Sequence, residues 1–224
     1  MAVEGLNLRG ALVLGSGLVY WLGVWVQARR VRHRIGHSPN VRPHGPKEKL
    51  LWAGWSFVVM SWVLVPFLNG FWWASPIHGL VGPAGFVVGA VLLVIGYTIT
   101  LWCYAAMGDA WRMGVIRSEI PELVTSGPFR FIRHPIYACQ SIMLMGIAIL
   151  IPSVLSFVIV LIHLLCAWIK VADEESHLRA RLGESYEAYC LLTRRWFPRL
   201  LKSKPRQTRP VVEERLKPAQ RPSK

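Results

Sequence analysis

The eleven residues GPFRFIRHPIY, 127–137, lie between two long apolar runs and bring Gly, Pro, Arg, His and Tyr to an expected membrane boundary. Pro135 keeps His134 out of the right-handed helical region, and Pro suits a first helical turn, so a membrane helix is predicted to start here. His134 then lies at the positive end of that helix, beside N–H groups that can hold a carboxylate or phosphate. From this segment alone, a cytoplasmic Arg anchor accounts for Arg130 and Arg133 equally well.

The composition indicates a membrane protein. The chain has 224 residues, is 53% hydrophobic, has a mean hydropathy of +0.37 and contains eleven Trp. Several uncharged apolar runs approach the roughly 20 residues that span a bilayer. We therefore predict an all-α, polytopic membrane helical bundle of about five crossings, with the last two forming a C-terminal hairpin. The expected helices are 8–26, 50–67, 83–106 and the two halves of 136–169, which Pro152-Ser153 divides.

The remaining segments are expected to be loops or a tail. Residues 27–49 contain Pro and Gly and are predicted to form a basic loop. We expect residues 1–200 to be a single domain, with 107–198 as its cofactor-binding part. Residues 201–224 are polar, Pro-rich and basic, which is typical of a disordered tail.

The charge distribution predicts the orientation in the membrane. The net charge is +14, and of the 26 Lys and Arg residues only Arg9 falls on the side opposite the loop 27–49 and the tail. Lys/Arg-rich loops mark the cytoplasmic side, so the N-terminus is expected outside and the C-terminus inside. Basic loops beside apolar helices favour membrane lipids over nucleic acid as partners. The four cysteines show no disulfide or zinc spacing, and no metal site is expected: Cys103, Cys139, Cys166 and Cys190.

Two neighbouring carboxylates follow the last apolar run. Residues 170–190 are predicted to continue the fifth helix into the cytoplasm, with an apolar stripe of Leu178, Leu182, Tyr186 and Tyr189. Glu175 lies four residues before Arg179, the spacing of an ordinary helical ion pair. Glu174 lies four before Leu178, on the stripe, where an idle carboxylate would be costly, so it has the stronger claim to a role.

The hairpin should bring these two features together. It places the start of its first helix near the end of its second, so His134 and Tyr137 are predicted to approach Glu174 and Glu175. Such a site can hold a carboxylate on N–H and Arg groups, an ammonium on Glu and a sulfonium on aromatic faces. S-adenosylmethionine carries these charges, and so does a zwitterionic lipid headgroup. A non-enzymatic, lipid-binding membrane scaffold also remains open.

Three motifs carry a family resemblance. The runs ELVTSGPFRFIRHPIY, DEESHLRARLGESYEAY and TRRWFP, within about 107–198, resemble the C-terminal signature of the isoprenylcysteine carboxyl methyltransferase family. Its members, with related phospholipid N-methyltransferases, are integral membrane enzymes that use S-adenosylmethionine, and the smaller prokaryotic members have a similar five-helix layout. The resemblance implies a cytoplasmic cofactor site formed by Leu123, Val124, Gly127, His134, Pro135, Tyr137, Glu174 and Glu175.

The resemblance also implies an activity. It is the transfer of a methyl group to a lipophilic acceptor, such as the carboxylate of a prenylated cysteine or a similar isoprenoid thioether. Arg133, Arg112 or Arg195 is expected to pair with that carboxylate, whereas an amine acceptor would need deprotonation by His134 or Glu174. A phospholipid, small-molecule or thiol methyltransferase with the same cofactor site is the alternative. This chain has Ala138-Cys139-Gln140 where many members have Gly, and Leu182 where they usually have Phe, and these departures bear on the acceptor.

Overall fold

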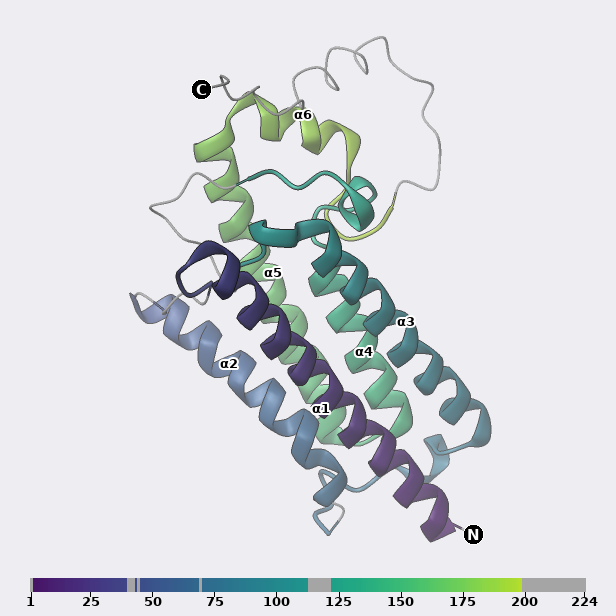
Figure 1. Ribbon diagram of the computed structural model, residues 1–224. Coiled ribbons are helices and arrows are strands. Elements are labelled where there is room, and N and C mark those ends of the chain that lie inside the picture. Colours follow the sequence, from purple (N-terminus) through teal and green to yellow (C-terminus); the bar gives the residue numbers. More distant parts are fainter. Residues whose placement is uncertain (1, 40–42, 44, 69, 113–121, 199–224) are drawn as a thin grey trace.

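Five helices run back and forth through one bundle, and a sixth, short helix lies at its end (Figure 1). The computed structural model describes residues 2–39, 43, 45–68, 70–112 and 122–198, with side chains from Leu8 onward. The expected tail, 201–224, lies outside these residues. The helices are α1 (Ala2–Ile35), α2 (Gly45–Leu64), α3 (Pro83–Met107), α4 (Pro135–Leu150), α5 (Val154–Leu182) and α6 (Glu184–Leu192). Four short 3₁₀ turns connect them: η1 (Val65–Phe67), η2 (His78–Leu80), η3 (Gly108–Ala110) and η4 (Gly127–Arg130).

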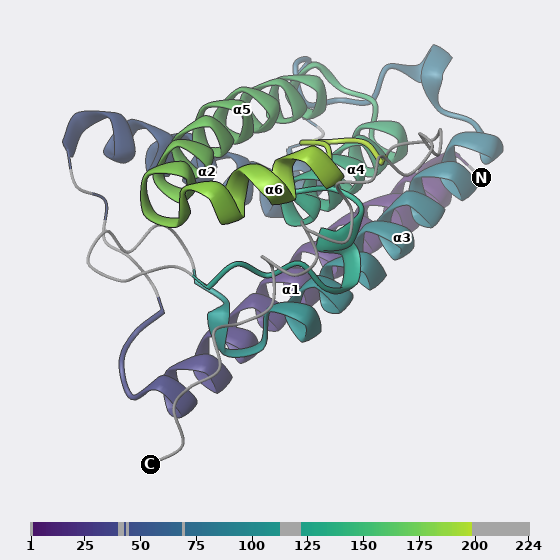
Figure 2. The same cartoon turned by 90° about the horizontal axis from the view of Figure 1, so that it is seen from above.

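The end of α5 differs from the prediction. A continuous helix through residue 190 was expected, but α5 ends at Leu182 and α6 begins at Glu184. Gly183 between them has φ +51°, a conformation that residues with a Cβ rarely adopt. The chain therefore reverses, and α6 folds back across the bundle end (Figure 2). The predicted stripe from Leu178 to Tyr189 is wrong as a single helical face, because Tyr189 is buried in the turned-back helix.

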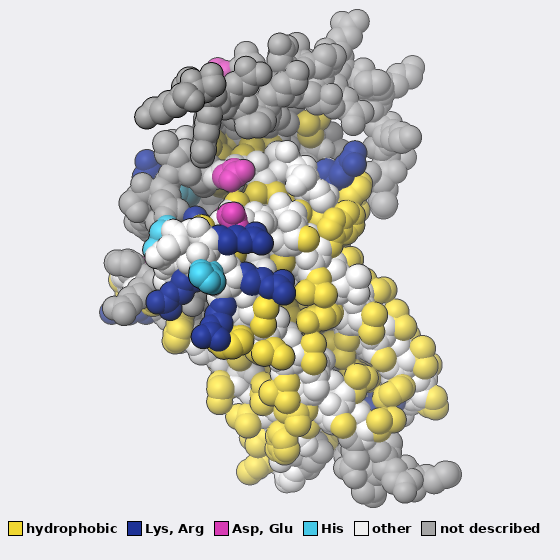
Figure 3. All heavy atoms as spheres, viewed as in Figure 1, with side chains coloured by type: hydrophobic (Ala, Val, Ile, Leu, Met, Phe, Trp, Pro, Cys, Tyr) yellow, Lys and Arg dark blue, Asp and Glu magenta, His cyan; other side chains and the backbone are white. Residues whose placement is uncertain are grey.

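The basic loop is also shorter than predicted. Residues 27–35 continue α1, because this segment contains no Pro or Gly and is rich in Arg, Ala and Gln, which favour helices. α2 begins at Gly45, with Pro46 in its first turn, where Pro initiates a helix rather than breaking it. Lys, Arg and His side chains gather at the boundary of the apolar surface near the end of α1 (Figure 3).

The outer surface of the bundle suits lipid. Apolar side chains such as Leu22, Val94 and Leu161 are more than half exposed, as expected of helices that face hydrocarbon (Figure 3). Four helical segments are long and apolar enough to cross a membrane: Leu8–Ile35, Gly45–Phe67, Pro83–Ala110 and Val154–Leu182. α4 is apolar but has 16 residues, short for a full span as the sequence predicted. The polytopic all-α bundle and the terminal hairpin of α4 and α5 are confirmed.

α3 and α4 pack with their backbones close together. A Cβ at Gly146 would lie 2.9 Å from the carbonyl oxygen of Gly89, and one at Gly96 would lie 3.0 Å from that of Cys139. Small residues that allow such an approach are typical of membrane helix pairs, because lipid offers no hydrophobic driving force for association. This contact fixes the position of the start of α4 relative to α3.

Arg9 holds the opposite end of the bundle. It is the basic residue that the sequence placed apart from all others, and its side chain is buried. Its guanidinium donates to the carbonyl oxygen of Leu150 at 2.9 Å and to that of Gly82. These carbonyls end α4 and precede α3, so one side chain ties the first helix to the α3–α4 pair.

We expect Gly146→Ala to lower the free energy of unfolding by about 1–3 kcal/mol, because the added methyl meets backbone that cannot move aside. Gly15→Ala in α1 is the matched control, since a Cβ there meets nothing within 4 Å and Ala favours a helix. Titration with denaturing detergent in mixed micelles, followed by circular dichroism, measures both. Equal stability of the two variants would contradict the close α3–α4 contact.

Candidate active site

The start of α4 and the end of α5 meet, as the hairpin predicted. Tyr137 Oη donates to Glu174 Oε1 at 2.7 Å. His134 Nε2 lies 3.3 Å from Glu175 Oε1, and His134 Nδ1 lies 3.6 Å from Glu174 Oε2. His134 itself is non-helical, with φ −126° and ψ 59°, and Pro135 is the first residue of α4. The predicted approach of the imidazole and the two carboxylates is therefore confirmed.

Glu175 is the most enclosed of these groups. Its side chain is fully buried, yet its carboxylate meets three guanidinium groups. Arg133 Nε donates to Oε1 at 3.0 Å, Arg195 Nε donates to Oε1 at 3.1 Å, and Arg195 Nη2 also donates to Oε2. Arg179 is more distant, with Nη2 at 3.6 Å from Oε2. The carboxylate is charge-paired from several directions, which is the condition under which a buried charge is tolerated.

The surroundings of the two glutamates differ from those that helical spacing predicted. The helical pair with Arg179 is the weakest contact of Glu175, and Arg179 Nε donates instead to Glu187 at 3.0 Å. Glu174, which seemed the costlier carboxylate, keeps 22% of its side chain exposed. Burial thus falls on Glu175, because the arginines that stabilise it come from segments distant in the sequence.

Arg195 lies on the segment that follows α6 and runs back beside η4. After α6, residue 194 forms an isolated parallel bridge with residue 132, and Arg133 N donates to Arg194 O at 2.8 Å. Arg133 Nη1 donates to Thr193 O at 2.8 Å, and Tyr189 Oη donates to Phe129 O at 2.6 Å. The motif TRRWFP therefore lies beside IRHP. Sequence reasoning named Arg195 but missed this route, and Gly183 was the signal for the reversal that makes it possible.

The other arginine and the glycine of the predicted site are held by the α3 end. Arg112 Nη1 donates to the backbone oxygens of Asp109 and Trp111. Gly127 has φ +58°, and a Cβ there would lie 2.7 Å from Ala106 Cβ. Leu123 and Val124 are half-buried in the segment that leads to η4. Pro135 is buried beside His134.

The local charges set the protonation of His134. Burial lowers its pKa, but hydrogen bonds and Coulomb attraction to the carboxylates of Glu174 and Glu175 outweigh that effect, so the pKa lies above its usual 6.5. The raised pKa favours the protonated imidazole, whose Nε2 is within hydrogen-bonding distance of Glu175 and whose Nδ1 lies 3.6 Å from Glu174. The cluster then holds a cationic imidazole and several guanidinium groups against two carboxylates, which leaves an excess of positive charge at the α4 N-terminus.

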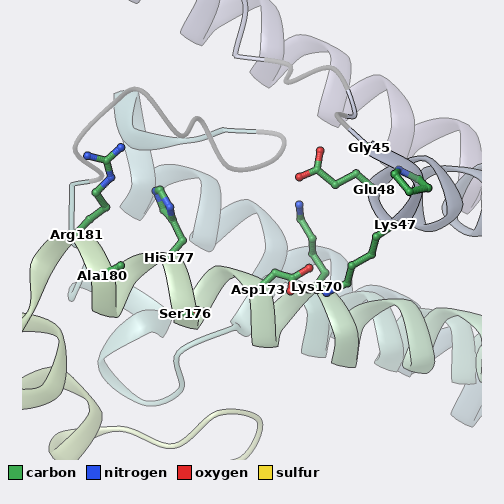
Figure 4. A pocket seen from close by; sticks show the side chains of 10 residues that line it. Gly45, Lys47, Glu48, Lys170, Asp173, Ser176, His177, Ala180 and Arg181 are labelled. Atoms are coloured by element: carbon green, nitrogen blue, oxygen red, sulfur yellow. Dashed lines mark hydrogen bonds and ion pairs between the residues drawn. The ribbon is translucent and has the colours of Figure 1, made fainter.

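A cavity of about 590 Å³ lies on the neighbouring side of α5 (Figure 4). It lies between the first turn of α2 and the C-terminal half of α5, and its polar lining comes from Lys47, Glu48, Lys170, Asp173, His177 and Arg181. Lys47 Nζ donates to Asp173 at 2.6 Å across it. None of the predicted cofactor residues lines this cavity, and the imidazole and the two carboxylates are in direct contact instead. The volume is within the range of small-molecule sites.

Within the described ranges no group of three or more His, Cys, Asp or Glu side chains is arranged to hold a metal ion.

Comparison with known proteins gives one family and two named relatives. Residues 84–185, which contain α3, α4 and α5, match the family model for phospholipid methyltransferase. The nickel-cobalt-cadmium resistance protein NccN of Alcaligenes xylosoxydans xylosoxydans is 28% identical over 200 residues, which are 87% of this chain and 75% of that protein. The cobalt-zinc-cadmium resistance protein CzcN of Cupriavidus metallidurans is 26% identical over 148 residues, 64% of this chain and 62% of that protein.

The matched residues include Arg133, His134, Tyr137, Glu174 and Glu175, so the contacts described above fall inside the matched region. Over this region the chain is similar to the phospholipid methyltransferase family.

Proposed function

We propose that this membrane methyltransferase moves a methyl group from S-adenosylmethionine to a lipophilic acceptor, the carboxylate of a prenylated cysteine or a similar isoprenoid thioether. One observation carries the proposal. Tyr137 and His134 at the start of α4 lie within hydrogen-bonding distance of Glu174 and Glu175 at the end of α5, next to apolar, lipid-facing helices.

The residues present suit the charges of the cofactor. Its carboxylate fits the free N–H groups at the start of α4 and the cationic His134. Its ammonium fits Glu174, whose carboxylate accepts one bond from Tyr137 and is still partly exposed. Leu123, Val124, Gly127 and Pro135 complete the site by resemblance. S-adenosylmethionine supplies a methyl group activated by a sulfonium, and aromatic faces attract such a cation.

Glu175 has a different part in the proposal. Its oxygens already accept from Arg133, Arg195 and His134, so we assign it to positioning: it holds the imidazole and both guanidinium groups around the cofactor site. This arrangement keeps several cations in place without their repelling one another, because one buried anion lies between them.

The acceptor carboxylate needs orientation rather than acid–base chemistry, because it is ionised at neutral pH. Arg195 is better placed for this than Arg133, since 34% of its side chain is exposed against 13% for Arg133. Arg112 lies at the α3 end and is the third candidate. Holding the two reactants together in the correct geometry can supply roughly 7–11 kcal/mol of the barrier.

The description of the matched family favours a second acceptor class, the amine of a phospholipid headgroup. That reaction needs removal of a proton, for which His134 or Glu174 is the candidate. The two relatives are named for metal resistance, and these names indicate no methyl acceptor. We place the site on the cytoplasmic side, because Arg34, Lys47 and Arg195 lie at this end of the bundle, and Lys and Arg residues mark that side.

We expect membranes that contain the chain to transfer labelled methyl from S-adenosylmethionine to N-acetyl-S-farnesylcysteine as a base-labile ester, in preference to phosphatidylethanolamine. Glu174→Gln should lower the rate about 10- to 100-fold, because a charge-assisted bond to the cofactor ammonium is lost. Glu187→Gln, an exposed acid paired with Arg179, is the control and should keep the wild-type rate. Label in phosphatidylethanolamine alone would select the amine reaction, and label in neither lipid would refute both acceptors.

Glu175→Gln should lower the free energy of unfolding by about 3 kcal/mol, because Arg133 and Arg195 lose a buried countercharge. Glu174→Gln should cost less than about 1 kcal/mol, since the amide oxygen still accepts from Tyr137. Detergent-induced unfolding of the two variants side by side measures this difference. A Glu175→Gln variant as stable as the wild type would contradict the positioning role.

The proton on His134 should add a pH dependence to stability. Because the folded-state pKa is raised, its contribution is fully present below the unfolded value near 6.5 and is lost as the pH rises through the raised pKa. We therefore expect the difference in melting temperature between the wild type and His134→Gln to shrink as the pH increases above 6.5. A difference that is constant from pH 5 to 9 would show that His134 is not held as a cation.

A further inference from the structure

A buried histidine lies in the apolar part of α5, away from the contacts described above. His163 is 1% exposed, among membrane-spanning residues where a polar ring is costly without partners. It precedes Glu174 by eleven residues, three helical turns, so the two side chains share a face of α5. The proposed reaction gives this imidazole no direct task.

The hydrogen bonds of His163 to Trp55 and Ser141 connect it with Tyr137. Trp55 Nε1 donates to His163 Nδ1 at 3.4 Å, and His163 Nε2 lies 3.2 Å from Ser141 Oγ. Ser141 Oγ in turn donates to the backbone oxygen of Tyr137 at 2.8 Å. The indole N–H can only donate, and the Ser141 proton is already used. The network therefore assigns a neutral imidazole with its proton on Nε2, donating to Ser141.

The same residues confine the Tyr137 ring. The indole of Trp55 stacks on it with centroids 5.8 Å apart and an interplanar angle of 16°. The imidazole of His163 also lies beside the Trp55 indole, with ring centroids 6.5 Å apart and an interplanar angle of 61°. The indole is thus held between the imidazole and the phenol, and Ser141 fixes the backbone that carries the phenol. Three helices, α2, α4 and α5, contribute to this arrangement.

We propose that His163 is a positioning residue for methyl transfer: through Trp55 and Ser141 it sets the orientation in which Tyr137 presents its hydroxyl to Glu174. The role of His163 in methyl transfer rests on the proposed function. Its effect on the orientation of Tyr137 does not, because that orientation exists without cofactor or acceptor. A leucine would fill the space of the imidazole but could neither accept from Trp55 nor donate to Ser141.

The test uses the full-length protein in detergent, labelled with 3-fluorotyrosine, with the ¹⁹F resonance of Tyr137 assigned by Tyr137→Phe. His163→Leu should shift that resonance, whereas His163→Asn, which can still accept and donate, should restore it in part. Cys166→Ala is the matched control, since Cys166 packs against Gly54 in the same α2–α5 contact and is absent from the network. If His163→Leu fails to fold, Trp55→Phe removes the donor to the imidazole and should give the same shift.

Binding of S-adenosylhomocysteine adds the functional readout. His163→Leu should weaken the binding of S-adenosylhomocysteine about tenfold in the wild type. In the Tyr137→Phe background it should have little effect, because His163 is proposed to act through the Tyr137 hydroxyl. An unchanged Tyr137 resonance in His163→Leu and Trp55→Phe, or an equal loss of affinity in both backgrounds, would overturn the inference. A wild type that does not bind S-adenosylhomocysteine would refute the proposed function, while the resonance would still decide the positioning of Tyr137.

Discussion

A carboxylate without solvent exposure, Glu175, is the constraint on which the site end of the bundle depends. Its contacts reach the η4–α4 junction through Arg133 and His134, and the returning chain through Arg195. Each segment would expose unpaired charge if it moved, since removing one partner of a buried ion pair is far costlier than leaving both in place. Arg133 extends the constraint further, because it also donates to Thr193 O just after α6.

The two adjacent glutamates differ in burial and in hydrogen-bond partners. Glu175 faces inward and is saturated by cations, whereas Glu174 keeps some exposure and accepts from the neutral hydroxyl of Tyr137. A helix rotates by about 100° per residue, so neighbours in the sequence can face a packed interior and an accessible surface. One residue can then stabilise the fold while the next remains able to bind a ligand. The stacked Trp55 and Tyr137 rings lie below them as an aromatic layer between α2 and α4.

Most of the helices and the terminal hairpin could be predicted from local sequence patterns. The predictions that failed depended on contacts between distant segments or on a single Pro or Gly. Apolar run lengths predicted the helices, and Pro152-Ser153 marked the hairpin that brings His134 toward Glu174 and Glu175. The continuation of α1 to Ile35 was missed because Pro residues later in the segment were read as breaking all of it. The reversal at Gly183 was missed because an apolar spacing was extended through a glycine. The burial of Glu175 was missed because it depends on Arg133 and Arg195, whose positions no local pattern contains.

The short α4 has a consequence for how reactants would meet. Its 16 residues rise about 24 Å, and near its start Gly127 packs against Trp102 and Ala106, so α3 extends past that level. In the proposed reaction a lipophilic acceptor would reach His134 and Tyr137 by lateral diffusion within one leaflet, without leaving the bilayer. A water-soluble donor would come from the other direction. For such an enzyme the relevant acceptor concentration is its mole fraction in the membrane, and dilution with inert lipid slows the encounter even when the bulk concentration stays the same.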